Sequence, residues 1–157
     1  MATVNFKINL IGTGWDDVYP NCAVYINDVA FARGAVTPKT CFEFDVELED
    51  DKEHELKLRY LYRDSLADVV RDQAGNIIKN RQFEIESIFI DDIELDNYNM
   101  LYLLGETKFS DRHYVHLHEN DPKRYPLITT GNTVLGTECT WSLKFTTPVY
   151  IWILENA

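Results

Sequence analysis

Residues 41–62 read CFEFDVELEDDKEHELKLRYLY, two alternating segments joined by a short charged stretch. In the first segment every second residue is apolar, from Phe42 to Leu48. In the second, the same alternation runs from Leu56 to Tyr62. A period of two places alternate side chains on opposite faces of a strand, whereas a helix would spread them around its axis. The stretch therefore predicts two strands that form a β-hairpin.

Alternation of the same kind recurs along most of the chain. It begins at residues 4–10, returns at 139–145, and becomes apolar on both faces at 88–90, as in a central strand. The pair Asn27-Asp28 lies between two apolar runs. Both residues tolerate positive φ, so the pair predicts a tight hairpin turn.

The whole pattern predicts an all-β fold, an antiparallel, jelly-roll-like β-sandwich of about nine or ten strands. Residues 149–154 form the last strand in this prediction, and no stretch shows helical periodicity. Residues 1–157 are expected to form a single domain, because this length is typical of one core. From about 97 to 137 the alternation weakens, and this region is predicted as an irregular, loop-rich elaboration.

The charge balance excludes some partners. The formal net charge is -11, from 15 Lys and Arg against 26 Asp and Glu. Such a surface repels phosphate backbones and anionic lipids, so we expect no nucleic acid and no membrane partner. The N-terminal residues alternate and lack the apolar core of a signal peptide.

The three cysteines are Cys22, Cys41 and Cys139, widely spaced and without a C-x-x-C motif. This odd number argues against both a disulfide framework and a zinc site. Each cysteine lies within or beside an apolar stretch, where a free thiol behaves as a small hydrophobe. The pattern indicates free thiols and synthesis in a reducing cytoplasm.

Histidines and acidic pairs are the candidates for metal binding. If their segment is a strand, His116 and His118 share a face, but a transition-metal site needs three or four ligands. A solvent-facing or interface-facing strand is therefore the favoured interpretation. The pairs Asp16-Asp17, Asp50-Asp51 and Asp91-Asp92 are alternatives for calcium, although solvated turns are the favoured interpretation of them.

Catalytic motifs are missing from the sequence. It has no G-x-S-x-G elbow and no phosphate-binding glycine loop, and nothing singles out two carboxylates for glycoside hydrolysis. We therefore expect no enzymatic activity, no catalytic residues, no metal ligands and no cofactor, with calcium kept as the alternative.

Aromatic residues in or beside predicted loops suggest a contact surface. Trp15, Tyr98 and Tyr102 are of this kind, and such side chains stack on sugar rings or anchor protein interfaces. Partial burial under long loops is the competing interpretation, with equal weight. Together with His116 and His118, these aromatic residues form the predicted interaction surface.

Residues 54–95 read HELKLRYLYRDSLADVVRDQAGNIIKNRQFEIESIFIDDIEL. An alternating strand is followed by a polar crossover with a D-x-x-G-N turn, and then by a strand that ends in I-x-I-D-D-I-x-L. This pattern resembles a β-sandwich domain common among structural proteins of tailed bacteriophages. It is also similar to calcium-dependent carbohydrate-binding modules of the xylan-binding type. Residues 8–26 are similar to the first hairpin of the same family.

The resemblance implies a non-enzymatic virion structural protein, which is neck, tail or fibre-associated or a capsid accessory. Such a protein is made in the host cytoplasm, resides in the virion and contacts other virion proteins in an oligomeric ring or fibre. Edge strands that extend a neighbour's sheet are a simple means of assembly. The alternative is a carbohydrate-binding module that recognises cell-surface glycans, with calcium as its candidate cofactor. The resemblance places no calcium ligand at a particular position.

Overall fold

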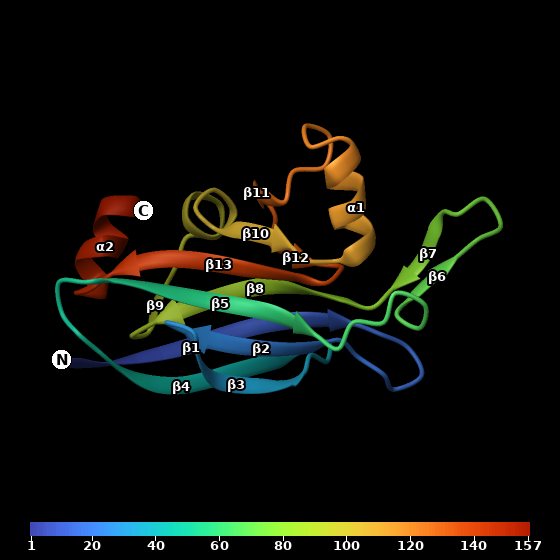
Figure 1. The fold of residues 1–157 in the computed structure, drawn as a ribbon. Coiled ribbons are helices and arrows are strands. Elements are labelled where there is room, and N and C mark those ends of the chain that lie inside the picture. The colour runs from blue at the N-terminus through green and yellow to red at the C-terminus, as the bar shows by residue number, and fades with distance from the viewer.

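Two antiparallel sheets pack face to face in the computed structural model, which describes residues 1–157 (Figure 1). The elements are, in chain order, β1 (Ala2–Thr13), β2 (Asn21–Ile26), β3 (Val29–Ala35), β4 (Thr40–Leu48), β5 (Glu53–Leu61), β6 (Val69–Arg71), β7 (Ile77–Asn80), β8 (Gln82–Ile90), β9 (Ile93–Glu94), the π-helical turn η1 (Asn97–Tyr102), β10 (Glu106–Phe109), α1 (Arg112–Asn120), β11 (Ile128–Thr130), β12 (Val134–Leu135), β13 (Cys139–Thr146) and α2 (Val149–Asn156).

The sheet order confirms the predicted β-sandwich. The sheet at the front of Figure 1, here called the front sheet, runs β11-β10-β13-β5-β2-β3. The back sheet runs β12-β8-β1-β4, and β9 pairs with β8. A separate hairpin of β6 and β7 projects from one end (Figure 1). The 13 strands exceed the predicted nine or ten because several, such as β9 and β12, have only two residues.

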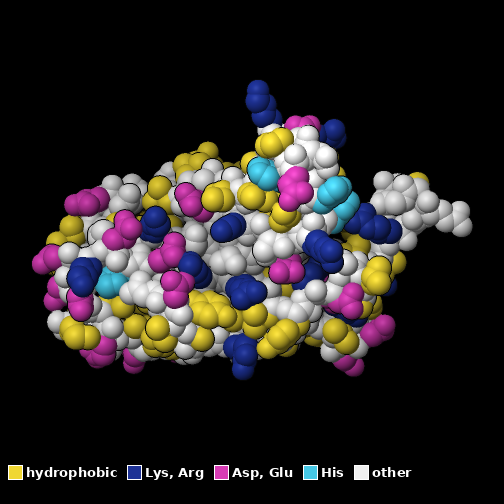
Figure 2. Space-filling model, viewed as in Figure 1, with side chains coloured by type: hydrophobic (Ala, Val, Ile, Leu, Met, Phe, Trp, Pro, Cys, Tyr) yellow, Lys and Arg dark blue, Asp and Glu magenta, His cyan; other side chains and the backbone are white.

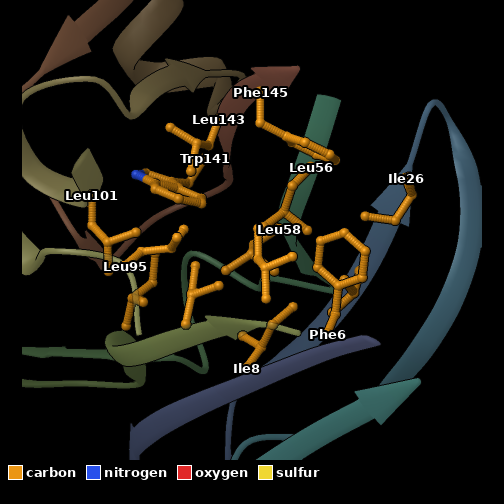
Figure 3. Packing of buried hydrophobic residues seen from close by; sticks show 14 of the residues in the cluster. Phe6, Ile8, Ile26, Leu56, Leu58, Leu95, Leu101, Trp141, Leu143 and Phe145 are labelled. Carbon is orange, nitrogen blue, oxygen red and sulfur yellow. The ribbon is translucent and has the colours of Figure 1, made fainter. Parts of the chain in front are cut away.

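The core lies between the inner faces of the two sheets. Leu56, Leu58 and Trp141 from the front sheet face Phe6 and Ile8 from the back sheet (Figure 3). They belong to a cluster of 28 buried residues that includes side chains from both sheets. Burying one such side chain contributes about 1.5–3 kcal/mol, so this cluster is the main source of stability.

One predicted hairpin is wrong. β4 pairs with β1 in the back sheet, whereas β5 pairs with β2 and β13 in the front sheet. The charged connection between β4 and β5 therefore carries the chain across the sandwich. In both arrangements each strand has one apolar face, so alternation alone does not distinguish a hairpin from a crossing. The turn at Asn27-Asp28 is confirmed: it joins β2 to β3, with φ values of 50° and 65°.

The predicted last strand is also wrong. Residues 149–154 belong to helix α2, which buries Val149, Trp152 and Ile153. The spacing of these three residues is that of one helical face. An unbroken apolar run shows no period, so the sequence did not distinguish a strand from a helix. No helix of the structure has the length and apolar character needed to span a bilayer.

Residues 97–137 are more regular than the predicted loop-rich elaboration. They contain η1, α1 and three short strands, and these strands extend both sheets. β10 pairs with β13 in the front sheet, and β12 pairs with β8 in the back sheet. Strands of two to four residues are too short for alternation to be recognised, and α1 buries no residue.

Gly105 allows the segment after η1 to lie directly against the core. A Cβ atom at this position would lie 2.4 Å from the Leu101 carbonyl oxygen and 2.4 Å from Nε1 of Trp141. The nitrogen of the Trp141 indole lies on the side of Leu101 (Figure 3). This Nε1 atom is buried and has no hydrogen-bond partner. The contact with Gly105 therefore depends on shape alone.

A buried arginine closes the end of the sandwich next to the β6–β7 hairpin. The Arg81 guanidinium pairs with Asp68 at 3.1 Å and donates to the carbonyl oxygens of Trp15, Val18 and Ala67. Its Cζ atom lies 4.0 Å from the centre of the Trp15 ring. Two separate segments of the chain, residues 15–18 and 67–68, are therefore joined to the start of β8 by one cation side chain.

Replacement of this cation by an apolar side chain of similar length should destabilise the fold. Arg81→Met leaves Asp68 buried without its partner, a change that costs about 3–5 kcal/mol. We expect urea unfolding to show this loss, whereas the exposed control Arg71→Met should change stability by less than about 1 kcal/mol. An Arg81→Met variant as stable as the control would show that the pair does not hold this end together.

Thiol reactivity tests the packing of the cysteines. Cys22 and Cys139 are buried, and burial raises the pKa of both thiols, that of Cys139 to about 12. Because the thiolate is the reactive form, both should resist a disulfide reagent near neutral pH. Cys41 is exposed, so one thiol should react in the native protein and all three after denaturation. Native labelling of Cys22 or Cys139, located by peptide mass spectrometry, would contradict this packing.

Candidate functional site

The five residues of the predicted interaction surface lie in three places. Trp15 is in the turn after β1, Tyr98 and Tyr102 are in η1, and His116 and His118 are on α1. Trp15 is half-buried against Arg81, so its ring already has a structural partner. The structure therefore separates residues that the sequence analysis grouped together, and their role in binding stays a prediction.

The two tyrosines stack on each other at the surface. Their ring centroids are 5.6 Å apart and the planes differ by 16°. The exposed fractions are 63% for Tyr98 and 40% for Tyr102. The Asp96 side chain caps the turn by accepting from the Tyr98 and Asn99 amides. The pair borders a small pocket. Each ring has only one face available to a ligand, because its other face is stacked on the second tyrosine.

The histidines lie on a helix instead of the expected strand. Residues two apart on a helix do not share a face, so the shared face predicted for His116 and His118 is wrong. The Nδ1 atom of His118 donates to the Tyr125 carbonyl oxygen at 2.7 Å. The Asp111 side chain starts the helix by accepting from the Tyr114 amide. His118 therefore fixes the loop that follows α1.

The acidic pairs form turns. Asp16, Asp17, Asp91 and Asp92 all have positive φ, between 50° and 63°. Asp91 also accepts from the Asn5 amide at 2.8 Å, which fixes the β8–β9 turn beside β1. No group of three or more His, Cys, Asp or Glu side chains converges as a metal site would require. Calcium binding therefore stays a prediction, with no cluster of these side chains to place the ion.

The outer face of the front sheet carries the strongest candidate site. Two adjoining hollows, of about 350 and 380 Å³, share Lys57, Lys108 and Thr140. Together they make one groove across β2, β5, β13 and β10, which we call the sheet groove. Its lining residues are Tyr25, Asp28, Glu55, Lys57, Arg59, Glu106, Lys108, Ser110, Ile128, Thr140, Ser142 and Lys144.

Strand register arranges these side chains in rows. One row crosses the sheet as Lys108, Thr140 and Arg59, which are directly paired neighbours. The next row is Glu106, Ser142, Lys57 and Tyr25. Neighbouring strands are about 4.8 Å apart, and side chains in one row project to the same face. The groove therefore presents cations, carboxylates and hydroxyls at regular spacing on a rigid support.

Charges within the groove differ in their pairing. The Nζ atom of Lys57 lies 2.7 Å from an Asp28 oxygen and 3.2 Å from a Glu55 oxygen. The hydrogen bond to Asp28 is the main cause of the raised pKa of Lys57. Arg59, Lys108 and Lys144 make no ion pair and no side-chain hydrogen bond. Figure 2 shows basic and acidic side chains interspersed over the middle of this face.

The sheet groove was not predicted from the sequence. Most of its members come from β2, β5, β10 and β13, which are distant in sequence, and only the register brings them into rows. A partial signal was present in residues 55–59, where Glu55, Lys57 and Arg59 alternate with the apolar core positions. The pairing partners of this strand were not predicted, so the groove was not recognised.

Comparison with known proteins gives two distant structural similarities. No protein-family model matches the chain, and no curated protein matches it. The selenomethionine form of vCBM60, described in work on two families of calcium-dependent carbohydrate binding modules, is 7% identical over 89% of each chain, with a TM-score of 0.48. vCBM60 in complex with galactobiose is 8% identical over 90% of this chain and 97% of that chain, with a TM-score of 0.42. Neither is described as a virion component, so the predicted virion role stays a prediction, and similarity at this level assigns no ligand to this chain.

Proposed function

We propose that this chain is a non-catalytic carbohydrate-binding domain whose ligand lies in the sheet groove. The observation that carries the proposal is the groove itself, a continuous polar channel on the face of a rigid sheet. Sites built on strands hold their hydrogen-bonding groups more accurately than sites built on loops. A glycan offers many hydroxyls at regular intervals, and the groove offers many polar groups at regular intervals.

The composition of the groove suits sugar hydroxyls. Ser142 and Thr140 offer groups that both donate and accept, Glu106 accepts, and Lys57 donates. Tyr25 is half-buried at one end, where its ring can support the apolar face of a sugar. Four strands at about 4.8 Å spacing make the groove roughly 14 Å long, which is enough for a short oligosaccharide.

A variant that fills the groove should abolish binding. Ser142 is in the middle of β13 and faces outward, so Ser142→Trp places a large ring in the channel at a position where strands accept aromatic residues. Thr146→Trp is the matched control, because Thr146 is on the same strand and face but outside the lining. On a glycan array, we expect Ser142→Trp to lose at least about tenfold in affinity, and the control to bind as the parent does.

Chelation and a second control separate this site from the alternatives. EDTA should leave binding unchanged, because no acidic cluster suited to calcium is present. Tyr98→Ala should also bind normally, since Tyr98 is outside the groove. The absence of glycan binding by the parent protein would refute the function. Equal binding by the two tryptophan variants would refute the site.

The β6–β7 hairpin favours a second candidate function, assembly with another virion subunit in a ring or fibre. The hairpin projects from the sandwich (Figure 1), and the exposed fractions of Ile77 and Ile78 on it are 55% and 61%. Leu66, in the segment that leads to the hairpin, is 89% exposed. Apolar groups gathered on a projecting element are typical of contact surfaces. A two-stranded hairpin is marginally stable alone, and a partner would add contacts to it.

Purified phage particles test this second candidate. If the chain is a virion component, mass spectrometry should detect it in particles of the phage that encodes it. Incorporation should fall severalfold for the double variant Ile77→Ser, Ile78→Ser, because the apolar contact area is lost. Val18→Ser, an exposed apolar residue outside the hairpin, is the control and should be incorporated normally. Absence of the parent chain from purified particles would exclude the virion role.

A further inference from the structure

We propose that the sheet groove selects an anionic glycan, one that carries carboxylate or sulfate groups between neutral, hydroxyl-bearing positions. This inference rests on the proposed function and names the class of ligand for the same groove. It comes from three cations that have no partner within the protein: Arg59, Lys108 and Lys144.

The register sets two of these cations on either side of one hydroxyl. Thr140 is paired with Lys108 of β10 on one side and with Arg59 of β5 on the other. The Cα atoms of Lys108 and Arg59 are therefore two strand spacings apart, roughly 10 Å. Both side chains are long enough to converge over Thr140, whose hydroxyl can also donate. An acidic group above Thr140 would receive hydrogen bonds from both cations.

The pairing pattern distinguishes this row from its neighbour. Lys57, in the next row, is held by Asp28 and Glu55 and so has its charge compensated. Arg59 and Lys108 have no such compensation, although the chain has 26 acidic residues against 15 basic ones. Basic side chains are scarce in this protein, yet several border a single groove without internal partners. A ligand that supplies the missing negative charge explains their position.

Mixed charge in the groove favours a glycan over a nucleic acid. Glu55 and Glu106 line the same channel, and the net charge of the chain is -11. A nucleic acid carries a charge at every phosphate and would meet these carboxylates along its length. An acidic oligosaccharide has neutral hydroxyls between its charged groups. These hydroxyls can donate to Glu106 and Glu55 while the charged groups contact Arg59 and Lys108.

Arg59 and Lys108 should contribute differently to recognition. The planar guanidinium of Arg59 can form two parallel hydrogen bonds with a carboxylate or a sulfate, whereas the Lys108 ammonium acts as a point charge. Arg59→Lys therefore keeps the charge but loses the paired geometry. This substitution separates specific recognition from simple electrostatic attraction.

Calorimetry with matched probes tests the proposal. The first pair is an oligogalacturonate and its fully methyl-esterified form, which share one backbone and differ in charge. The second pair is a sulfated galactan oligosaccharide and its desulfated form, so the two pairs separate a preference for carboxylate from one for sulfate. We expect at least one charged probe to bind at least about tenfold more tightly than its neutral counterpart, because hydrogen bonds to charged groups contribute more.

Substitutions at Arg59 and Lys108 test whether these residues cause the preference for the charged probe. Arg59→Gln and Lys108→Gln should each reduce binding of the charged probe about tenfold and leave the neutral probe within about twofold. Arg59→Lys should give an intermediate loss. Lys39→Gln makes the same change of charge at an exposed position outside the groove, and it should bind as the parent does. Arg59 and Lys108 are both exposed, so thermal unfolding should be nearly unchanged in all four variants.

The possible results distinguish failure of this inference from failure of the proposed function. If neutral and charged probes bind equally, the inference fails while the proposed function stands. If no neutral or charged glycan binds, both fail. Binding of oligothymidylate as tight as that of the charged probes would show that the groove responds to charge alone, and would overturn the assignment to a glycan.

Discussion

Contact between the two sheets determines which side chains of this protein are available for binding. Each sheet gives one face to the core, so every second residue of a long strand is committed to burial. On β5, Leu56 and Leu58 meet that requirement, and Lys57 and Arg59 are left on the outside. The groove follows from the same packing that stabilises the fold, because inner residues fix the register that aligns the outer ones. A shift of one residue would exchange the two sets.

Much of the sandwich could be predicted because polar and apolar residues alternate along a half-buried strand. Strands β1, β4, β5 and β13 are long enough to show it, and all four appear where the alternation was found. The connection between β4 and β5 shows the limit. Alternation reports that a strand has an apolar face, but not which strand it pairs with, so a crossing between sheets was taken for a hairpin. For α2, a continuous apolar run contained no period at all.

The candidate site was harder to predict from the sequence than the fold. Aromatic residues in loops were predicted to form the interaction surface because such residues often anchor contacts. In the structure, Trp15 packs against Arg81 and Tyr98 stacks on Tyr102. The groove combines residues from β2, β5, β13 and β10, whose positions in the chain extend from Tyr25 to Lys144. Charged residues on the outer parity of a strand normally signify solubility. They indicate a site only when the register shows that cations without partners surround a common hydroxyl.

The close approach of Gly105 to Trp141 has an evolutionary consequence. Position 105 has room for a hydrogen atom and little else, because the indole and the Leu101 carbonyl occupy the space of a side chain. A larger residue there requires both a smaller side chain in place of the Trp141 ring and a shift of the backbone at Leu101. The two positions are 36 residues apart in the sequence, yet a change at position 105 requires a change at position 141. Divergent descendants of this sequence that replace Gly105 should therefore also have replaced Trp141.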